Sequence, residues 1–403
     1  MFLNLVFGLV ILVNQVTALP TIFEDDIKAL GYPCEQHLVK TSDGFILTLF
    51  RIQAKASPTD DNNRLIADKP VVLMAHGLDE SSDVYIINTE GKSLAIVLAN
   101  SGYDVWLLNN RGTAYSRQHS KYHVSDPKLW DYSFQEMASI DVPEVLAFIT
   151  LFTKQEKVVA IGHSQGSTQF IAAMSDIDTS QRVQSKLHAL IGISPVPMIS
   201  NIHGRTKIIY DLITYYIPFR NYIGINYPVL SSTTRNWFKN SIRALCSFSV
   251  TTCEGIMWLP GLIADNHCPN ALGRLLEVLP GGASFRSYAH FEQLSRINED
   301  LPVLRKFDFE SPEENSRRYG AAVPPDYNYT LISTPLFFHS GRKDTLSTPE
   351  GLERFANYFR TLGKSISLIL YDDWDHFSPL ISEYPQEAFS KILADVAASF
   401  ASK

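Results

Sequence analysis

The sequence has little charge of either sign and no concentration of positive charge. Of the 403 residues, 19% are Asp, Glu, Lys or Arg, and the formal net charge at pH 7 is −7. Lys and Arg are scattered along the chain, whereas proteins that bind nucleic acid concentrate them in basic clusters. We therefore expect a neutral substrate and no nucleic-acid partner.

Cysteine is also scarce, because the chain has only Cys34, Cys246, Cys253 and Cys268. Their spacing does not match that of a zinc site, so no metal is expected. Cys246 and Cys253 are close enough in sequence for a short loop to bridge them. Cys34 and Cys268 could pair with each other or remain free.

Long apolar runs are absent beyond the first residues. Residues 1–18, MFLNLVFGLVILVNQVTA, form a short apolar run that ends in small residues, a pattern typical of a secretory signal peptide cleaved near Ala18. A membrane anchor is the alternative, but the run is short for a bilayer and is interrupted by Asn4 and Asn14. We expect a soluble mature chain without a transmembrane segment.

Entry into the secretory pathway permits disulfides and glycans. The sequence contains one glycosylation sequon, at Asn328. A single sequon offers little scope for sorting by glycans, so we expect a secreted protein, with a lysosomal location as the alternative.

Buried-strand patterns alternate with helical patterns at both ends of the chain. This alternation predicts an α/β fold in which a mostly parallel central sheet is flanked by helices. The expected strands are 70–77, 103–110, 157–164, 188–196, 334–341 and 365–372, and the expected helices are 133–152, 348–360 and 387–401. Residues 35–52 alternate polar and apolar side chains around Asp43-Gly44, which predicts an antiparallel hairpin at the sheet edge.

The alternation stops between about residues 200 and 325, where aromatic and apolar residues crowd the sequence. The chain is also longer than a single core usually grows. We expect residues 19–199 and 326–403 to form one core domain. Residues 200–325 would be a mostly helical cap and lid, inserted between the sixth and seventh strands and packed over the carboxyl edge of the sheet, where open α/β sheets place their active sites.

The strongest motif is GHSQG, which surrounds Ser164 and lies between a strand pattern and a helix pattern. A serine at such a strand-to-helix turn is exposed above the sheet, where it can act as a nucleophile. A glycine-rich turn with an incidental serine is the alternative. The serine needs a base and a carboxylate, which follow it along the chain in the order acid, then histidine.

Asp344 lies just past a predicted strand, and His376 is the only histidine that follows it. Asp372, Asp373 and Asp375 are alternatives for the carboxylate, although residues so close in sequence to His376 seldom point at it. His163 is expected to pack or form hydrogen bonds rather than act as the base. His119, His123 and His290 are expected to be ordinary surface or cap residues.

Attack on a carbonyl creates an oxyanion that backbone N–H groups must bind. One N–H is expected from Gln165, directly after the nucleophile. The second is expected from Leu78, because Gly77 allows a sharp turn after the strand at 70–77.

With these residues in place, the chain resembles the acid lipase family, which includes gastric and lysosomal acid lipases. The resemblance runs from residue 31 nearly to the C-terminus. Its most specific pieces are MAHGLDESSDVYI (74–86), GYDVWLLNNRGTAYSR (102–117), FQEMASIDVP (134–143), GHSQGS (162–167) and PPDYNYT (324–330).

The resemblance implies an α/β-hydrolase core with a helical cap and a mobile lid, and a lipase that needs no metal or organic cofactor. It implies a neutral lipid substrate, triacylglycerol or sterol ester, at an oil–water or lipoprotein surface. It also implies Ser164, Asp344 and His376 as catalytic residues and Leu78 and Gln165 as oxyanion donors. The cap disulfide of the family maps best onto Cys246 and Cys253.

The chain departs from the family pattern at Asp375 and Ser378 beside the histidine, at Leu108 and at Pro260. These changes bear on substrate range more than on the chemistry. A carboxylesterase of short esters, a noncatalytic lipid-binding protein of the same fold and a serine peptidase remain as alternatives. All three residues of the predicted triad are present, which disfavours the noncatalytic alternative, and the family motifs disfavour the peptidase.

Overall fold

The computed structural model describes residues 22–57, 65, 69–88, 90–199, 202, 241 and 267–401. The predicted signal peptide (1–18) lies outside these residues, as do Cys246, Cys253 and, except for positions 202 and 241, the predicted cap up to residue 266. The signal peptide, the disulfide and the cap therefore stay predictions. Cys34 and Cys268 lie inside the described part and are free cysteines.

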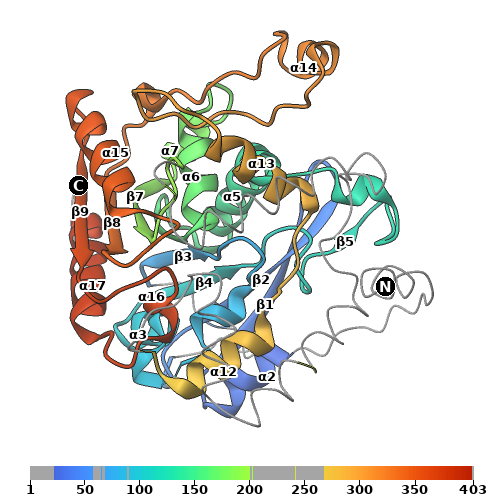
Figure 1. Ribbon diagram of the computed structural model, residues 1–403. Coiled ribbons are helices and arrows are strands. Elements are labelled where there is room, and N and C mark those ends of the chain that lie inside the picture. The colour runs from blue at the N-terminus through green and yellow to red at the C-terminus, as the bar shows by residue number, and fades with distance from the viewer. Residues whose placement is uncertain are drawn as a thin grey trace, which may run out of the picture.

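A nine-stranded sheet organises the described residues, with the strand order β1-β2-β4-β3-β6-β7-β8-β9 and with β5 paired to β2. The strands from β4 to β9 along this order are parallel, whereas β1 pairs with β2 and β2 with β4 in antiparallel fashion. The expected parallel sheet and its antiparallel hairpin are thus confirmed (Figure 1). The strands are Cys34–Lys40 (β1), Phe45–Ile52 (β2), Val71–Ala75 (β3), Asp104–Leu108 (β4), Gln118–His119 (β5), Val158–His163 (β6), Leu187–Ile193 (β7), Leu336–Gly341 (β8) and Ile366–Tyr371 (β9).

The short strand β5 was not among the expected strands. Because β5 precedes β6, the long insertion of the sequence falls between β7 and β8, the seventh and eighth strands of the described sheet. Residues 118–119 are too few for any periodic pattern, so the sequence carries no signal for them.

Both faces of the sheet are buried. Successive side chains of a strand point to opposite faces, so a strand buried on both sides contributes to two core clusters. In β3, Val71 and Leu73 belong to one core cluster, and Val72 and Met74 belong to the other. All four side chains are fully buried, which explains why this strand is apolar throughout.

Helices cover each face (Figure 1). Side chains of α4, α5, α6, α7, α13 and α15 join the first cluster, and those of α2, α3, α12, α16 and α17 join the second. The first group is Phe134–Glu136 (α4), Val142–Thr153 (α5), Gln165–Ser175 (α6), Ser180–Gln184 (α7), Phe285–Ser295 (α13) and Pro349–Thr361 (α15). The second group is Ile22–Ala29 (α2), Leu94–Asn100 (α3), Pro269–Val278 (α12), Ser378–Ile381 (α16) and Gln386–Ala401 (α17); the helix α14 (Pro312–Tyr319) projects from the body.

The helices expected from periodicity are present. Helix α15 begins after Thr348, whose hydroxyl accepts a hydrogen bond from the Gly351 N–H at 3.3 Å, and Pro349 occupies its first turn. The expected helix 133–152 is present as α4 and α5, joined by a π-helical turn at Met137–Asp141 that periodicity did not predict. Within the ranges described here, no helix is both long and apolar enough to cross a membrane.

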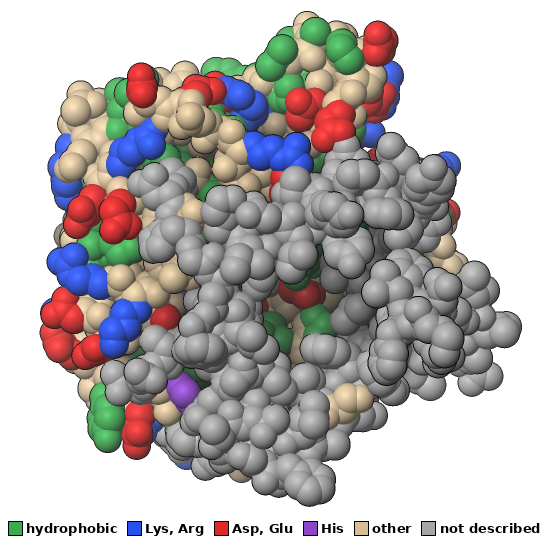
Figure 2. Space-filling model, in the orientation of Figure 1, with side chains coloured by type: hydrophobic (Ala, Val, Ile, Leu, Met, Phe, Trp, Pro, Cys, Tyr) green, Lys and Arg blue, Asp and Glu red, His purple; other side chains and the backbone are tan. Residues whose placement is uncertain are grey.

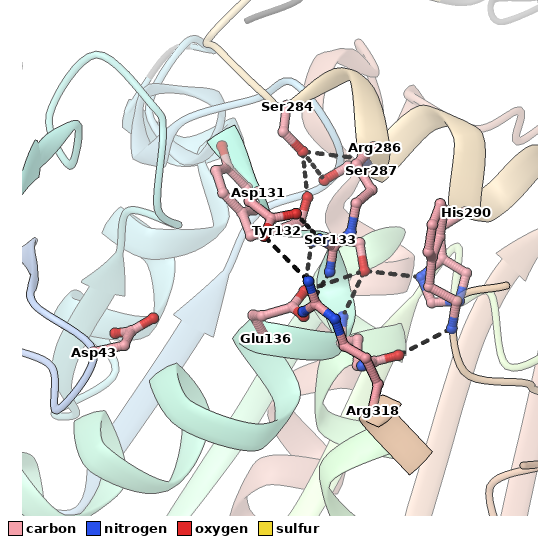
Figure 3. A network of polar contacts seen from close by, with 12 residues as sticks. Asp43, Asp131, Tyr132, Ser133, Glu136, Ser284, Arg286, Ser287, His290 and Arg318 are labelled. Carbon is pink, nitrogen blue, oxygen red and sulfur yellow. Dashed lines mark hydrogen bonds and ion pairs between the residues drawn. The ribbon is translucent and has the colours of Figure 1, made fainter. Parts of the chain in front are cut away.

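A buried polar network joins α13 to the segment before α4 (Figure 3). The fully buried guanidinium of Arg286 pairs with Asp131 and, at 2.7 Å, with Glu136. The hydroxyl of Ser133 lies 2.9 Å from Nδ1 of His290. His290 is completely buried, so the expectation of a surface position is wrong for this histidine.

The surface formed by the described residues carries both signs of charge. In the view of Figure 2, acidic and basic side chains are interspersed over the part of this face that these residues form. They build no basic patch there, which agrees with the scattered Lys and Arg of the sequence.

Candidate active site

Ser164 lies between β6 and α6, at the carboxyl edge of the sheet. Its backbone has φ 50° and ψ −121°, a conformation that an L-residue adopts only when its surroundings impose it. Its N–H donates to the Ile193 carbonyl at 3.0 Å, which ties the turn to the neighbouring strand β7. The predicted strand-to-helix turn is therefore present.

The two glycines of GHSQG are required by close backbone contacts. A Cβ atom on Gly166 would lie 2.0 Å from the Ala75 carbonyl oxygen at the end of β3. A Cβ on Gly162 would lie 2.4 Å from the backbone nitrogen of Ser167. Only glycine allows α6 to start this close to β3 and so brings Gln165 towards the loop that follows β3.

Ser164, His376 and Asp344 come together in a chain of hydrogen bonds. Nε2 of His376 lies 3.0 Å from Oγ of Ser164, and Nδ1 of His376 lies 2.9 Å from Oδ2 of Asp344. All three residues are at least nine-tenths buried, which keeps water from competing for these contacts. Hydroxyl, imidazole and carboxylate thus have the order and spacing that proton transfer from a serine requires.

The loops that carry the acid and the histidine are stabilised locally. Oδ1 of Asp344 accepts hydrogen bonds from the N–H groups of Leu346 (2.9 Å) and Ser347 (2.8 Å). Asp375 and Ser378 bond reciprocally: Oδ1 of Asp375 accepts from the Ser378 N–H at 2.8 Å, and the Ser378 hydroxyl accepts from the Asp375 N–H at 2.9 Å. The two residues at which the chain departs from the family pattern therefore stabilise the His376 loop by bonding to each other.

The alternative carboxylates bond to other groups. Oδ1 of Asp375 also accepts from the Phe377 N–H. Asp372 and Asp373 are largely exposed and pair with Arg342 and Lys343. Among the described residues, Asp344 is the carboxylate that contacts the His376 ring.

The predicted oxyanion donors lie on two adjacent elements. Gln165 is the first residue of α6, and the first N–H groups of a helix have no acceptor inside that helix. Leu78 is partly buried in the loop after β3 and packs against the first core cluster. The N–H of Gly77 is already bonded, because it donates to Glu80 at 2.6 Å. The next N–H along the loop is that of Leu78.

Residues 281–288, a late part of the predicted insertion, hold this loop from outside. Asp79, with φ 61°, accepts a hydrogen bond from the Gly282 N–H at 2.8 Å and one from the Tyr288 hydroxyl at 2.9 Å. Its carbonyl accepts from the Gly281 N–H at 2.5 Å. A Cβ on Gly281 would lie 2.3 Å from the Glu80 carbonyl oxygen, so the two backbones are in direct contact.

A buried acid and a buried histidine lie beneath the same loop. Oε1 of Glu80 is 2.9 Å from Nδ1 of His163, and Nε2 of His163 is 3.0 Å from the His376 carbonyl oxygen. Burial by itself would lower the pKa of His163, but the Glu80 carboxylate raises that pKa above its ordinary value. Burial would likewise raise the pKa of Glu80, yet attraction to His163 and hydrogen bonds lower it.

His76, the residue directly after β3, is buried and neutral. Its Nδ1 lies 2.8 Å from the Gly77 carbonyl oxygen, and its Nε2 accepts from the Asn110 N–H at 3.0 Å. Burial lowers the pKa of His76 to about 4.

The sequence predicted the three residues of the contact chain, Ser164, His376 and Asp344, but it indicated no role for Glu80 or Asp79. A signal for Glu80 was available, since β3 and β6 are adjacent parallel strands with Ala75 opposite Gly162. Residues that follow such strands come together at the sheet edge, so a carboxylate after β3 can meet the histidine that ends β6. The partners of Asp79 lie about two hundred residues away, and no local pattern predicts that contact.

Family models match the first half of the chain, and known relatives match most of it. A model of the partial α/β-hydrolase lipase region matches residues 23–89, and a model of the α/β-hydrolase fold matches residues 70–210. Among solved structures, an esterase from Exiguobacterium antarcticum superposes with a TM-score of 0.52 at 14% identity, covering 90% of this chain and 100% of that one. At that identity the likeness concerns the fold alone.

Two curated relatives match over almost the whole length. Gastric triacylglycerol lipase of Rattus norvegicus is 30% identical over 372 residues, which are 91% of this chain and 89% of the relative. Lipase member N of Mus musculus is also 30% identical over 372 residues, 90% of this chain and 87% of the relative. Together with the fold and the site geometry, these matches show that the chain belongs to the acid lipase family of α/β-hydrolases.

Proposed function

We propose that the protein is a lipase that hydrolyses the carboxylic ester bonds of neutral lipids, with triacylglycerols as the main substrates and sterol esters as a second class. The observation that carries the proposal is the contact chain from Ser164 through His376 to Asp344, with distances of 3.0 and 2.9 Å. Such a chain turns a weakly nucleophilic hydroxyl into one that attacks a carbonyl carbon.

The reaction proceeds in two acyl-transfer steps. Oγ of Ser164 bonds to the ester carbonyl carbon while its proton moves to Nε2 of His376, and the tetrahedral intermediate collapses as His376 returns that proton to the leaving alcohol. In the second step His376 takes a proton from water, whose oxygen attacks the acyl-enzyme. The fatty acid then leaves and Ser164 regains its proton. Asp344 stabilises the imidazolium in both steps.

Two backbone N–H groups, those of Leu78 and Gln165, bind the oxyanion in this proposal. Gln165 lies at the positive end of α6, whose dipole also favours negative charge. No step needs a metal or an organic cofactor, because serine, histidine and carboxylate supply the nucleophile, the base and the orienting group.

The choice of lipid rests on the relatives and on the sequence of the insertion. The first relative named above is a gastric triacylglycerol lipase. Residues 200–325 are rich in aromatic and apolar residues, as a cap over an acyl-chain cleft would be. We propose that this cap meets substrate at an oil–water or lipoprotein surface.

We further propose a secreted protein, with a lysosomal location as the alternative, and a glycan on Asn328. Asn328 is exposed, and its side-chain oxygen accepts from the Thr330 hydroxyl at 2.6 Å. Loss of mass on treatment with an Asn-glycan amidase, absent in Asn328→Gln, would support the glycan. An unchanged mass in the protein secreted by eukaryotic cells would contradict it.

The test of the function is a chain-length series of triacylglycerols plus a cholesteryl ester, assayed across acid and neutral pH with Ser164→Ala as the control. A lipase hydrolyses emulsified long-chain triacylglycerol, and the alanine variant loses that activity while keeping its fold. Hydrolysis confined to short soluble esters would instead indicate a carboxylesterase. Equal rates on monomeric and emulsified substrate would contradict the surface proposal.

A further inference from the structure

We propose that Glu80 and His163 are positioning residues: as a buried ion pair they hold the oxyanion loop and the catalytic-histidine loop in place around Ser164. This inference rests on the proposed function, because it assigns the pair to the same reaction. Neither side chain touches Ser164 Oγ, so both act through other groups.

Three contacts link the two loops through the pair. Glu80 accepts a hydrogen bond from the Gly77 N–H at 2.6 Å. Its two carboxylate oxygens lie 2.9 and 3.1 Å from Nδ1 of His163. Nε2 of His163 completes the connection to the carbonyl oxygen of His376 at 3.0 Å. One continuous chain therefore runs from the residue before Leu78 to the backbone of the catalytic histidine.

The contacts of His163 fix its protonation. A carbonyl oxygen only accepts hydrogen bonds, so Nε2 must carry a proton to bond to His376. Nδ1 faces a carboxylate that also accepts, so it carries the second proton. The ring is fully buried and Glu80 is 2% exposed, so the charged forms stabilise each other out of contact with water.

Among the described residues, the titratable groups that face the pair are His76, which is neutral, the phenol of Tyr85, which donates to the Ala75 carbonyl, and the triad residues Asp344 and His376. The Asp344 carboxylate also favours the charged form of His163. The pair thus has one positive and one negative charge, with the positive ring on the side of His376. The ring centroids of His163 and His376 are 5.2 Å apart.

This arrangement has a direct consequence for catalysis. The bond from the Gly77 N–H to Glu80 holds the backbone directly before the Leu78 N–H, the proposed oxyanion donor. The bond from His163 to the His376 carbonyl oxygen holds the backbone that carries the base. Small displacements of a base or an oxyanion donor reduce the rate strongly, about 10²-fold for a misplacement near 1 Å. The pair also places a positive ring beside His376, so loss of that charge changes the electrostatic field at the base.

Two substitutions separate geometry from charge. Glu80→Ala removes both bonds of the carboxylate. Glu80→Gln can keep the chain without charge, because its amide oxygen accepts from Gly77 and its NH₂ donates to Nδ1 of a neutral His163, which still donates from Nε2 to His376. The control is Asp176→Asn, a buried carboxylate at the far end of α6 that pairs with Lys306.

The experiment measures kcat and KM on tributyrin, the pH profile of kcat/KM, and the rate at which a long-chain alkyl phosphonate labels Ser164, all on protein shown by circular dichroism to be folded. We expect Glu80→Ala to lower kcat about 10²-fold with KM nearly unchanged. Glu80→Gln should keep kcat within about tenfold but shift the acid limb of the profile upward by about half a pH unit, because the nearby positive charge is lost. Asp176→Asn should match wild type.

A wild-type kcat and an unshifted acid limb in both Glu80 variants would overturn the proposal, as would a loss confined to KM. If Glu80→Ala does not fold, the acid limb of Glu80→Gln decides alone. A wild-type protein that neither hydrolyses tributyrin nor reacts with the phosphonate would contradict the proposed function itself. If the wild type does both and the Glu80 variants behave identically to it, only the positioning role fails.

Discussion

At the scale of single residues, Ser164 shows how neighbouring atoms impose an unfavourable conformation. A left-handed φ costs an ordinary residue about 1 kcal/mol or more. Gly162 and Gly166 let three backbone segments approach within distances that no Cβ tolerates, and the bond to Ile193 fixes the turn to β7. The hydroxyl is thereby held in front of His376 before any substrate binds.

Gly166→Ala tests this packing. The added methyl would lie 2.0 Å from the Ala75 carbonyl oxygen, so α6 or β3 must shift. We expect a loss of about 1–3 kcal/mol in the free energy of unfolding and a fall in kcat, because Gln165 moves with the helix start. Denaturant unfolding and ester hydrolysis measure the two effects.

Gly273→Ala is the matched control, since it sits inside helix α12 and a Cβ added there would meet no neighbouring atom within 4 Å. It should stabilise the protein by up to about 1 kcal/mol, because alanine favours helix over glycine. Equal behaviour of the two variants would contradict the packing argument.

The residues at the site divide into those that local sequence predicts and those that it does not. Ser164, Asp344 and His376 each follow a strand pattern, and chain order alone narrowed the base to one histidine. Glu80 also follows a strand pattern, but nothing local marks its side chain as buried, because a carboxylate in a loop is usually solvated and its burial follows from packing. His290 was misjudged for the same reason: its partners, Ser133 and the Arg305 carbonyl, come from distant segments or bond through the backbone.

At the scale of elements, helix α13, which lies within the residues predicted as the insertion, is attached to the core in part through a buried cation. The Arg286 guanidinium is completely buried, while its partners Asp131 and Glu136 are 31% and 17% exposed. It also lies 5.1 Å from the ring centroids of Phe307 and Phe309, at cation–π distance. Helix α13 therefore joins α4 through charge and packing together (Figure 3).

Arg286→Ala should lower the free energy of unfolding by about 3 kcal/mol, because two carboxylates lose a buried partner, although Asp131 keeps Arg318, and the rings lose a contact. Arg317→Ala is the control: that side chain is 64% exposed and pairs with Glu314. Its loss should leave the free energy of unfolding nearly unchanged. Similar losses of unfolding free energy in the two variants, measured by denaturant unfolding, would show that the burial of Arg286 adds no stability.

The elements themselves were largely predictable. Long apolar strands and helices such as 348–360 carry strong periodic patterns, and their existence was confirmed with boundaries within a few residues. The π-helical turn at Met137–Asp141 was not predicted, since a single extra residue in a helix barely changes an apolar pattern. It contacts α6, so tertiary packing around the nucleophile helix accompanies the irregularity.

At the scale of the whole molecule, buried neutral histidines make stability depend on pH. Nε2 of His290 donates to the Arg305 carbonyl, and Nδ1 lies 2.9 Å from the Ser133 hydroxyl, which can donate to a neutral ring. Burial lowers the pKa of His290 from 6.5 to about 3. Between these values the unfolded chain binds a proton that the folded protein does not, so stability falls as pH falls from 6.5 towards 3.

His290→Gln should flatten this dependence, because the amide can make both hydrogen bonds and does not titrate. The wild type should lose up to about 1.4 kcal/mol per pH unit more than the variant between pH 6 and 4. Above pH 7.5 the difference between the two proteins should stay constant, which provides an internal control. Parallel curves of unfolding free energy at acid pH would contradict a buried neutral His290.

The central claim is that Ser164, activated by His376 and Asp344, is the nucleophile of an ester hydrolase acting on lipids. The most direct measurement is reaction with a long-chain alkyl phosphonate ester, followed by mass spectrometry of the digested protein and assay of triacylglycerol hydrolysis. We predict one phosphonyl group per chain, located on Ser164, with activity lost in proportion to labelling and no labelling of Ser164→Ala. A label on another residue, or full triacylglycerol hydrolysis by fully labelled protein, would contradict the account.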